Sequence, residues 1–246
     1  MNRERSRLLK DLAQAGYARL SAAAAVRALK LDVPALETLR NSWEHLPADT
    51  YLRDGGHYRA RRHSCFVQTL GGSLAAVAHR AHWQPTDYNA LHGGLVRWFE
   101  PIEPSVLAAR AWTQLLEAIG EVFAALSPVP RWCIEAHQFR IDTAQGLGRP
   151  TPEGAHRDGV DFVALILVGR RQISGGETRV FDARGPAGVS FTLQEPWSML
   201  LMDDARVIHE TTPIQAQGAS GARDTLVLTY RAGDFQAPPT PARGVS

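Results

Sequence analysis

Two residues of the segment 152–160, His156 and Asp158, could bind one metal ion together. Side chains two positions apart point to the same side of an extended chain, so an imidazole nitrogen and a carboxylate oxygen can reach the same ion. His209, at the end of the segment 203–209, is the candidate third ligand. Two histidines and one carboxylate are typical of non-haem Fe(II) oxygenases, and they leave coordination positions open for substrates. Zn²⁺ sites more often take cysteine or a third histidine, so the residue types favour iron.

A second group with chemical potential lies near the C-terminus. Arg223 and Thr225 open the apolar segment 226–230, which predicts a strand. An arginine held at the start of a strand can bind a carboxylate through two parallel hydrogen bonds, and Thr225 can add a hydroxyl donor. The residues therefore indicate a metal site together with a carboxylate-binding site.

Short strands must hold these groups in place. The apolar run 161–168 predicts a buried strand that begins directly after the metal motif. Turn signals at Gly175–Gly176 and at 185–188 separate further strands. These are predicted at 178–181 and 198–202.

The segment 132–141 is a further predicted strand. Its alternation places His137 on one face, and Gln138 and Arg140 on the other. One of the two faces must look into the interior of the fold. His137 itself is expected to be a buried core histidine with a hydrogen-bond partner.

Helices are predicted to flank the strands. Residues 1–46 show apolar residues at helical spacing, and we expect this segment to pack on the strands, with a lid or a dimer contact as the alternative. The segment 105–126 is the clearest helix, with an apolar stripe that can support the back of a sheet.

Composition limits the function classes. The chain has 246 residues, of which 21% are charged, and its formal net charge of +2 gives no support for nucleic-acid binding. No apolar run reaches the length of a membrane span, and the first residues lack the apolar core of a signal peptide. Cys65 and Cys133 are far apart and are expected to be reduced core thiols. We therefore expect a cytoplasmic protein.

The sequence resembles the Fe(II)/2-oxoglutarate-dependent dioxygenases. Within them it is similar to the bacterial group that contains L-isoleucine dioxygenase and related free amino-acid hydroxylases. The closer resemblance is carried by the segments 137–141, 151–163, 209–214 and 223–230. It implies a mainly β fold with flanking helices, a double-stranded β-helix (jelly roll, cupin-like). The expected organisation is an N-terminal helical segment at 1–50, the dioxygenase domain at 51–236 and a flexible tail at 237–246.

The resemblance also implies roles for the site residues. His156, Asp158 and His209 would bind Fe(II), and Arg223 with Thr225 would bind the distal carboxylate of 2-oxoglutarate. Related enzymes place polar groups on the cosubstrate from the strand 132–141. The candidates there for contacts with 2-oxoglutarate or substrate are Gln138 and Arg140. With O2, and ascorbate in assays, such an enzyme hydroxylates or sulfoxidises a free aliphatic L-amino acid and releases succinate and CO2.

Two polar segments are candidates for binding that small-molecule substrate. Residues 51–66 are rich in arginine and aromatic residues, and Arg59 could bind a carboxylate, although such a run is also typical of a solvated charged strand. Residues 86–101 could line the mouth of a pocket, with His92 expected as a surface or capping residue. The substrate candidates from this segment are Tyr88, Asn89 and Arg97.

Two other classes of protein remain open. A non-catalytic metal-binding jelly roll with a stress or biofilm regulatory role would not need the complete set of metal and carboxylate ligands. A Zn-dependent cupin-type enzyme would not need Arg223 for a dicarboxylate. Both alternatives are therefore less favoured than the dioxygenase. A homodimer is compatible with the sequence, but no segment specifies one.

Overall fold

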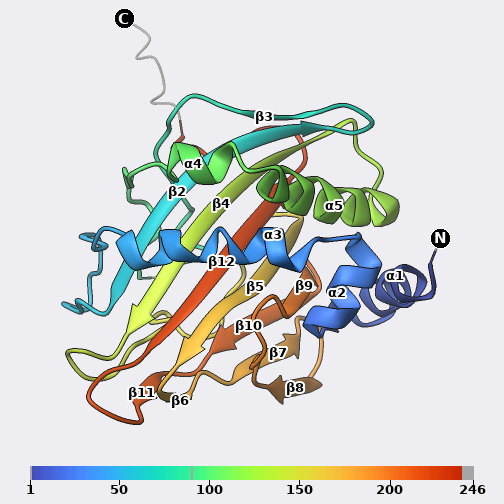
Figure 1. Ribbon diagram of the computed structural model, residues 1–246. Helices are drawn as coiled ribbons and strands as arrows, with labels where there is room; N and C mark the ends of the chain where they lie inside the picture. Colours follow the sequence, from blue (N-terminus) through green and yellow to red (C-terminus); the bar gives the residue numbers. More distant parts are fainter. Residues whose placement is uncertain (1, 90, 240–246) are drawn as a thin grey trace, which may run out of the picture.

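The computed structural model describes residues 2–89 and 91–239, and its centre is a seven-stranded antiparallel sheet (Figure 1). In spatial order the strands are β1 (Tyr17–Leu20), β9 (Met199–Asp203), β5 (Phe162–Arg171), β12 (Ala222–Arg231), β4 (Arg131–Asp142), β2 (Arg59–Thr69) and β3 (Leu74–Ala76). The last strand of the chain, β12, lies in the middle of this sheet between β5 and β4. The metal motif, which precedes β5, and Arg223 on β12 line the same cavity.

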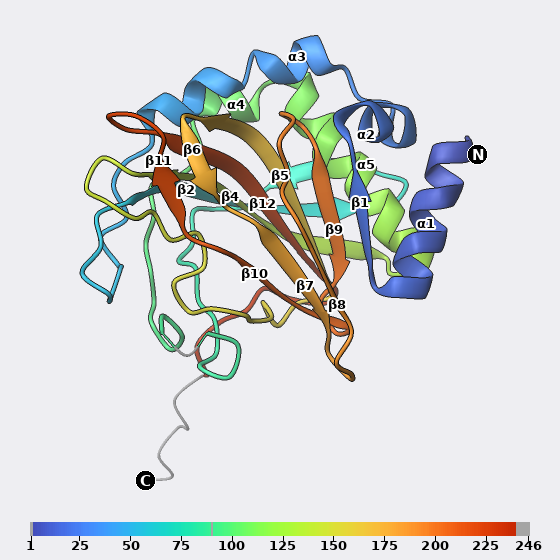
Figure 2. The same cartoon turned by 90° about the horizontal axis from the view of Figure 1, so that it is seen from below.

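Short strands face the large sheet. One group consists of β10 (Val207–Thr211), β7 (Thr178–Asp182) and β8 (Gly188–Phe191), and the other of β11 (Ile214–Ala216) and β6 (Ile173–Gly175). In Figure 2 the helices lie on one side of the large sheet, and β7, β8 and β10 lie on the other. Val163 and Leu165 on β5 pack against Val180 on β7 and Val207 on β10, which closes the two layers on each other. The result is the predicted jelly roll.

Helices cover the outer face of the large sheet. They are α1 (Arg3–Ala15), α2 (Ala22–Leu29), α3 (Val33–Glu37), the 3₁₀ helix η1 (Arg40–His45), α4 (Pro104–Leu107) and α5 (Arg110–Leu126). The apolar stripe of α5 is fully buried, and Phe123 stacks on Phe162 of β5 with 4.5 Å between the ring centroids. The hydroxyl of Tyr230 on β12 donates to the carbonyl of Leu116 at 2.8 Å, which satisfies the polar atom of a buried ring. The predicted helix at 105–126 is therefore present, but it is divided into α4 and α5.

The N-terminal segment contains a short strand at residues 17–20 besides its helices. Gly16 ends α1 with φ of 77°, a conformation that glycine adopts without strain, and the chain then turns into the edge strand β1. Ala18 and Leu20 are buried in the same hydrophobic cluster as α1, α2 and α5. The prediction of helices throughout this segment missed β1.

Two further points concern the sequence predictions. The predicted tail falls mostly on residues 240–246, outside the described residues. No helix in the described ranges is both long and apolar enough to cross a membrane.

Candidate metal centre and its cavity

His156, Asp158 and His209 converge on one point inside the jelly roll. Nε2 of His156 lies 3.9 Å from Oδ1 of Asp158, and Nε2 of His209 lies 3.8 Å from Oδ2. The ligand atoms of all three residues lie within 4.8 Å of one another. His156 and His209 are cross-strand neighbours, since their backbones exchange hydrogen bonds of 3.0 and 2.9 Å. This backbone pairing fixes the spacing of the two imidazoles.

The protonation of the two histidines suits a metal ion. Nδ1 of His156 lies 3.0 Å from the carbonyl oxygen of Gly154, which can only accept, so Nδ1 carries a proton and Nε2 is the nitrogen that faces the other ligands. Burial lowers the pKa of His156, but Asp158 and then Glu153 raise it above its ordinary value, because these carboxylates favour positive charge at Nε2. Burial, and then His156, hold the pKa of His209 well below its ordinary value, so that this ring is neutral. The neutral ring of His209, Nε2 of His156 and the carboxylate of Asp158 thus face one another at distances too long for hydrogen bonds. A bound cation would relieve this arrangement, and three protein ligands would leave positions open on Fe(II).

Asp204 holds the metal loop in its conformation. Its carboxylate accepts hydrogen bonds from the backbone N–H groups of Asp158, Gly159 and Val160, at 2.9, 2.8 and 3.2 Å. Gly159 has φ of 74°, and a Cβ at this position would lie 2.5 Å from the ring of Tyr88. The loop therefore needs both a glycine and a buried acceptor.

We expect Asp204→Asn to weaken Fe(II) binding by about 10- to 100-fold, the effect typical of residues that orient metal ligands. An amide has only one accepting oxygen and turns an N–H group toward backbone donors. The matched control is Asp203→Asn, because among the described residues the carboxylate of Asp203 accepts only from Ala205 N, at 3.1 Å. Anaerobic titration of Fe(II) into both variants measures the effect. Equal affinities would contradict this role for Asp204.

Arg223 is a buried cation with unused donors. Its side chain is 3% exposed, and Nε and Nη2 have no hydrogen-bond partner in the described part of the chain. Burial, and then Arg170, lower the pKa of Arg223 to about 10. Two free N–H groups of a guanidinium match the two oxygens of a carboxylate. Thr225 lines the same cavity, so these residues fit the distal carboxylate of 2-oxoglutarate.

The cavity between the two layers combines one apolar wall with several charged groups. The apolar wall consists of Phe139, Ile141, Val163, Leu165 and Val227. The charged and polar side chains that line it include Arg59, Arg61, His82, Gln84, Asn89, His92, Arg97, Glu153 and Arg223. Among the arginines, Arg59 Nη2, Arg61 Nε and Arg97 Nε are buried and have no partner in the described residues. Buried donors of this kind normally have an acceptor, and the anionic group of a ligand could provide one.

Among the predicted substrate contacts, Arg59, Asn89 and Arg97 line the cavity, and Tyr88 does not. Arg59 is not solvated, since Nε donates to Asp49 at 2.7 Å and the side chain is 7% exposed. Tyr88 instead packs on Gly159 from outside the metal loop.

Gln138 and Arg140 are on the outer face of β4 and do not line the cavity. Nε2 of Gln138 donates to Ser42 Oγ at 2.9 Å, and Arg140 pairs with Asp224 and Glu44. The predicted contact of these residues with 2-oxoglutarate or substrate is therefore corrected. The inner face of β4 carries the other set of alternating residues.

The two histidines singled out as non-ligands behave differently. His137 is buried as predicted, and its Nδ1 lies 2.6 Å from Nη2 of Arg61. His92, expected at the surface or as a cap, is 1% exposed and lines the cavity, so that prediction was wrong. Sequence reasoning also missed His82, Gln84 and Glu153. The only signal for the first two was their period-two spacing before the polar segment 86–101.

Comparisons with known proteins show the family of the chain. The family described as 2OG-Fe dioxygenase matches residues 40–229, so the chain belongs to this family. The crystal structure of a BsmA homologue from Methylobium petroleophilum PM1 is 55% identical, with a TM-score of 0.91 over 96% of both chains. No protein in the comparison with curated proteins matches the sequence.

Two more distant structures share the fold. The structure of IDO from Bacillus thuringiensis is 17% identical, with a TM-score of 0.76 over 95% of this chain and 97% of the other. The Fe(II)/α-ketoglutarate-dependent dioxygenase TqaL is 15% identical, with a TM-score of 0.69 over 94% and 91%. The protein is an oxidoreductase that uses Fe(II), 2-oxoglutarate and O2. His156, Asp158 and His209 could hold the iron.

Proposed function

We propose that the protein oxidises a free aliphatic L-amino acid, by hydroxylation at carbon or oxidation at sulfur, with release of succinate and CO2. The resemblance to the bacterial amino-acid hydroxylases supports this substrate class. His156, Asp158 and His209 bind Fe(II), and Arg223 and Thr225 bind the distal carboxylate of 2-oxoglutarate. When bound, iron and 2-oxoglutarate together activate O2. The protein's own residues position one substrate bond beside the metal and exclude water.

The charge balance of the cavity carries the proposal. The cavity is lined by three arginines besides Arg223, namely Arg59, Arg61 and Arg97. Three carboxylates offset them: Asp49 is paired with Arg59, Glu135 lies behind His82, and Glu153 lines the cavity. A phosphate or a dicarboxylate would add net negative charge to this balance, and a simple amine would add net positive charge. A zwitterion adds none, and it can use both the free arginine donors and a carboxylate.

The walls favour an aliphatic side chain. Val163 and Leu165 on β5 and Val227 on β12 form a continuous apolar surface on the inner face of the large sheet. Four of the five residues of the apolar wall are aliphatic and one, Phe139, is aromatic, so an aliphatic ligand would make dispersion contacts along the whole wall. The metal ligand Asp158 lies in the same cavity. An aliphatic substrate would therefore place a C–H bond or a thioether sulfur near the iron.

The test is a succinate-release assay with Fe(II), ascorbate and 2-oxoglutarate against the free L-amino acids. We expect one or a few aliphatic amino acids, methionine included, to raise succinate formation, each with a product heavier by one oxygen atom. The controls are the D-enantiomer and the N-acetyl derivative of the best substrate. No stimulation by any amino acid, with Fe(II) and 2-oxoglutarate bound, would refute the substrate class.

We place the enzyme in the cytoplasm. Cys65 and Cys133 are both free and buried, and burial raises the pKa of each thiol. Free core thiols suit a reducing compartment. Fractionation of the native host, followed by detection with an antibody, tests the location.

A further inference from the structure

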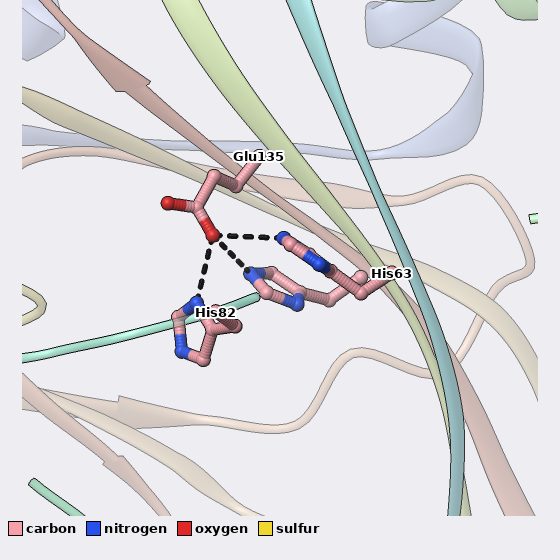
Figure 3. A group of neighbouring side chains, drawn as sticks. His63, His82 and Glu135 are labelled. Carbon is pink, nitrogen blue, oxygen red and sulfur yellow. Dashed lines mark hydrogen bonds and ion pairs between the residues drawn. The ribbon is translucent and has the colours of Figure 1, made fainter. Parts of the chain in front are cut away.

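A cluster of His63, His82 and Glu135 lies at the wall of the cavity (Figure 3). Oε2 of Glu135 lies 2.8 Å from Nε2 of His63 and 2.7 Å from Nδ1 of His82. We infer that His82 and Arg97 form the subsite for the head group of the substrate, in which His82 Nε2 accepts from the α-ammonium and Arg97 binds the α-carboxylate. Glu135 and His63 are positioning residues behind His82. The inference rests on the proposed function and assigns the residues that recognise its substrate.

The hydrogen bond to Glu135 sets the tautomer of His82. Burial alone would raise the pKa of Glu135, but His82 and His63 hold it well below its usual range. An ionised carboxylate can only accept, so Nδ1 of His82 carries the proton. Burial lowers the pKa of His82 to about 4, so the ring is neutral and Nε2 holds a lone pair. His82 lines the cavity, and its Nε2 makes no hydrogen bond to any described residue.

Arg97 lies directly beside His82. The two residues form an antiparallel bridge, with hydrogen bonds of 2.9 Å from His82 N and 3.0 Å from Arg97 N. Residues paired in this way carry their side chains on the same face, with Cβ atoms about 5 Å apart. A cation with a free Nε thus stands next to a neutral acceptor. The head group of an α-amino acid needs such a pair, because its carboxylate and ammonium share one carbon.

Gln84 connects this subsite to the metal centre. Its Oε1 accepts from Nη2 of Arg97 at 3.1 Å, and its Nε2 donates to Oδ1 of Asp158 at 3.3 Å. One side chain therefore separates the proposed carboxylate site from a metal ligand. A head group bound here would leave the aliphatic side chain to lie along the apolar wall beside the iron.

Together with His137, this cluster places its ligand atoms close enough to hold a second metal ion, but the hydrogen bonds of the histidines oppose metal binding. Arg61 can only donate, so Nδ1 of His137 accepts at 2.6 Å and Nε2 carries the proton, which prevents it from binding a metal. Nδ1 of His63 has no partner among the described residues, whereas metal-bound histidines normally donate from the second nitrogen. The cations Arg61 and Arg97 also repel a metal dication, whereas the ammonium of a zwitterion carries a single charge and brings its own carboxylate. The cluster is therefore a hydrogen-bonded acceptor site.

The test compares an amino-acid substrate with its analogue that lacks the amino group, for example L-leucine with 4-methylpentanoate. In the wild type we expect a strong preference for the amino acid. Glu135→Gln keeps the shape but can donate to Nδ1 of His82, which reverses the tautomer, and His82→Leu removes the acceptor. Both should raise KM for the amino acid by about 10- to 100-fold, the effect of one hydrogen bond to a charged group. KM for 2-oxoglutarate and turnover of the analogue should stay within about two-fold.

The control variant is His79→Gln. His79 lies on the same segment but bonds to the carbonyl of Phe99 at 2.8 Å and does not line the cavity. Wild-type turnover of amino acids with an unchanged preference in Glu135→Gln would overturn this inference alone. No wild-type turnover of any amino acid would instead overturn the proposed function, and the inference with it. A second metal equivalent that the wild type binds and Glu135→Gln loses would also overturn it, since His82 Nδ1 would then be a ligand.

Discussion

Asp158→Ala should abolish iron-dependent succinate formation and weaken Fe(II) binding by more than about 100-fold, beyond the effect of losing a residue that only orients a ligand. Asp158 is the carboxylate that both imidazoles face, at 3.9 and 3.8 Å. Without it, two histidines are left, and the two-histidine, one-carboxylate set that Fe(II) uses loses its anionic ligand. The fold should persist, because Asp204 still holds the backbone of the metal loop through three N–H groups.

The measurement is the iron content after anaerobic desalting, together with succinate formation. Asp182→Ala is the control, because Asp182 is exposed at the end of β7 and its carboxylate accepts from Arg184 N. His209→Ala should behave like Asp158→Ala. If Asp158→Ala retains near-normal turnover with a full complement of iron, the ligand assignment is wrong.

The metal motif was predictable because its chemistry is local. His156 and Asp158 are two residues apart, and the apolar run after them predicts the buried strand β5. His209 follows a predicted strand as well. The only part that could not be predicted was that the segments of His156 and His209 pair with each other. The structure supplies it through the backbone bridge between His156 and His209.

The orientation of β4 could not be read from the sequence in the same way. Alternation divides the strand into two faces, but it does not say which face looks inward. The answer depends on Ser42 and Glu44, which lie on η1 and bind Gln138 and Arg140. These partners lie about a hundred positions away in the chain, where no local signal connects them to β4.

The burial of charged side chains could not be predicted from the sequence for a related reason. Arg59 and Arg61 resemble a solvated run in the sequence, but both are buried against Asp49. Burial by itself would raise the pKa of Asp49, and the two arginines hold it below its ordinary value. His82 and Arg97 are positioned by one isolated bridge in a segment with little regular structure. Periodicity cannot predict such a contact.

Arg223 is the residue on which 2-oxoglutarate binding should depend most. Its guanidinium lies on the inner face of β12, in the same row of the sheet as Ile141 on β4 and Arg59 on β2. Neighbouring Arg170, whose Nη2 donates to the carbonyls of Ile173 and Gly175, is a second cation and repels Arg223. A buried cation without a partner costs stability, and a bound carboxylate would recover that cost.

Arg223→Ala should therefore raise KM for 2-oxoglutarate by on the order of 100-fold or more, since losing one partner of a buried ion pair costs about 2–5 kcal/mol. Arg223→Lys should be intermediate, because an ammonium lacks the planar fork. The melting temperature of the free protein should not fall, whereas its rise with 2-oxoglutarate and Mn²⁺ should disappear. Arg140→Ala is the control, since Arg140 binds Glu44 and Asp224 on the outer face. An unchanged KM in Arg223→Ala would move the carboxylate site to another arginine of the cavity.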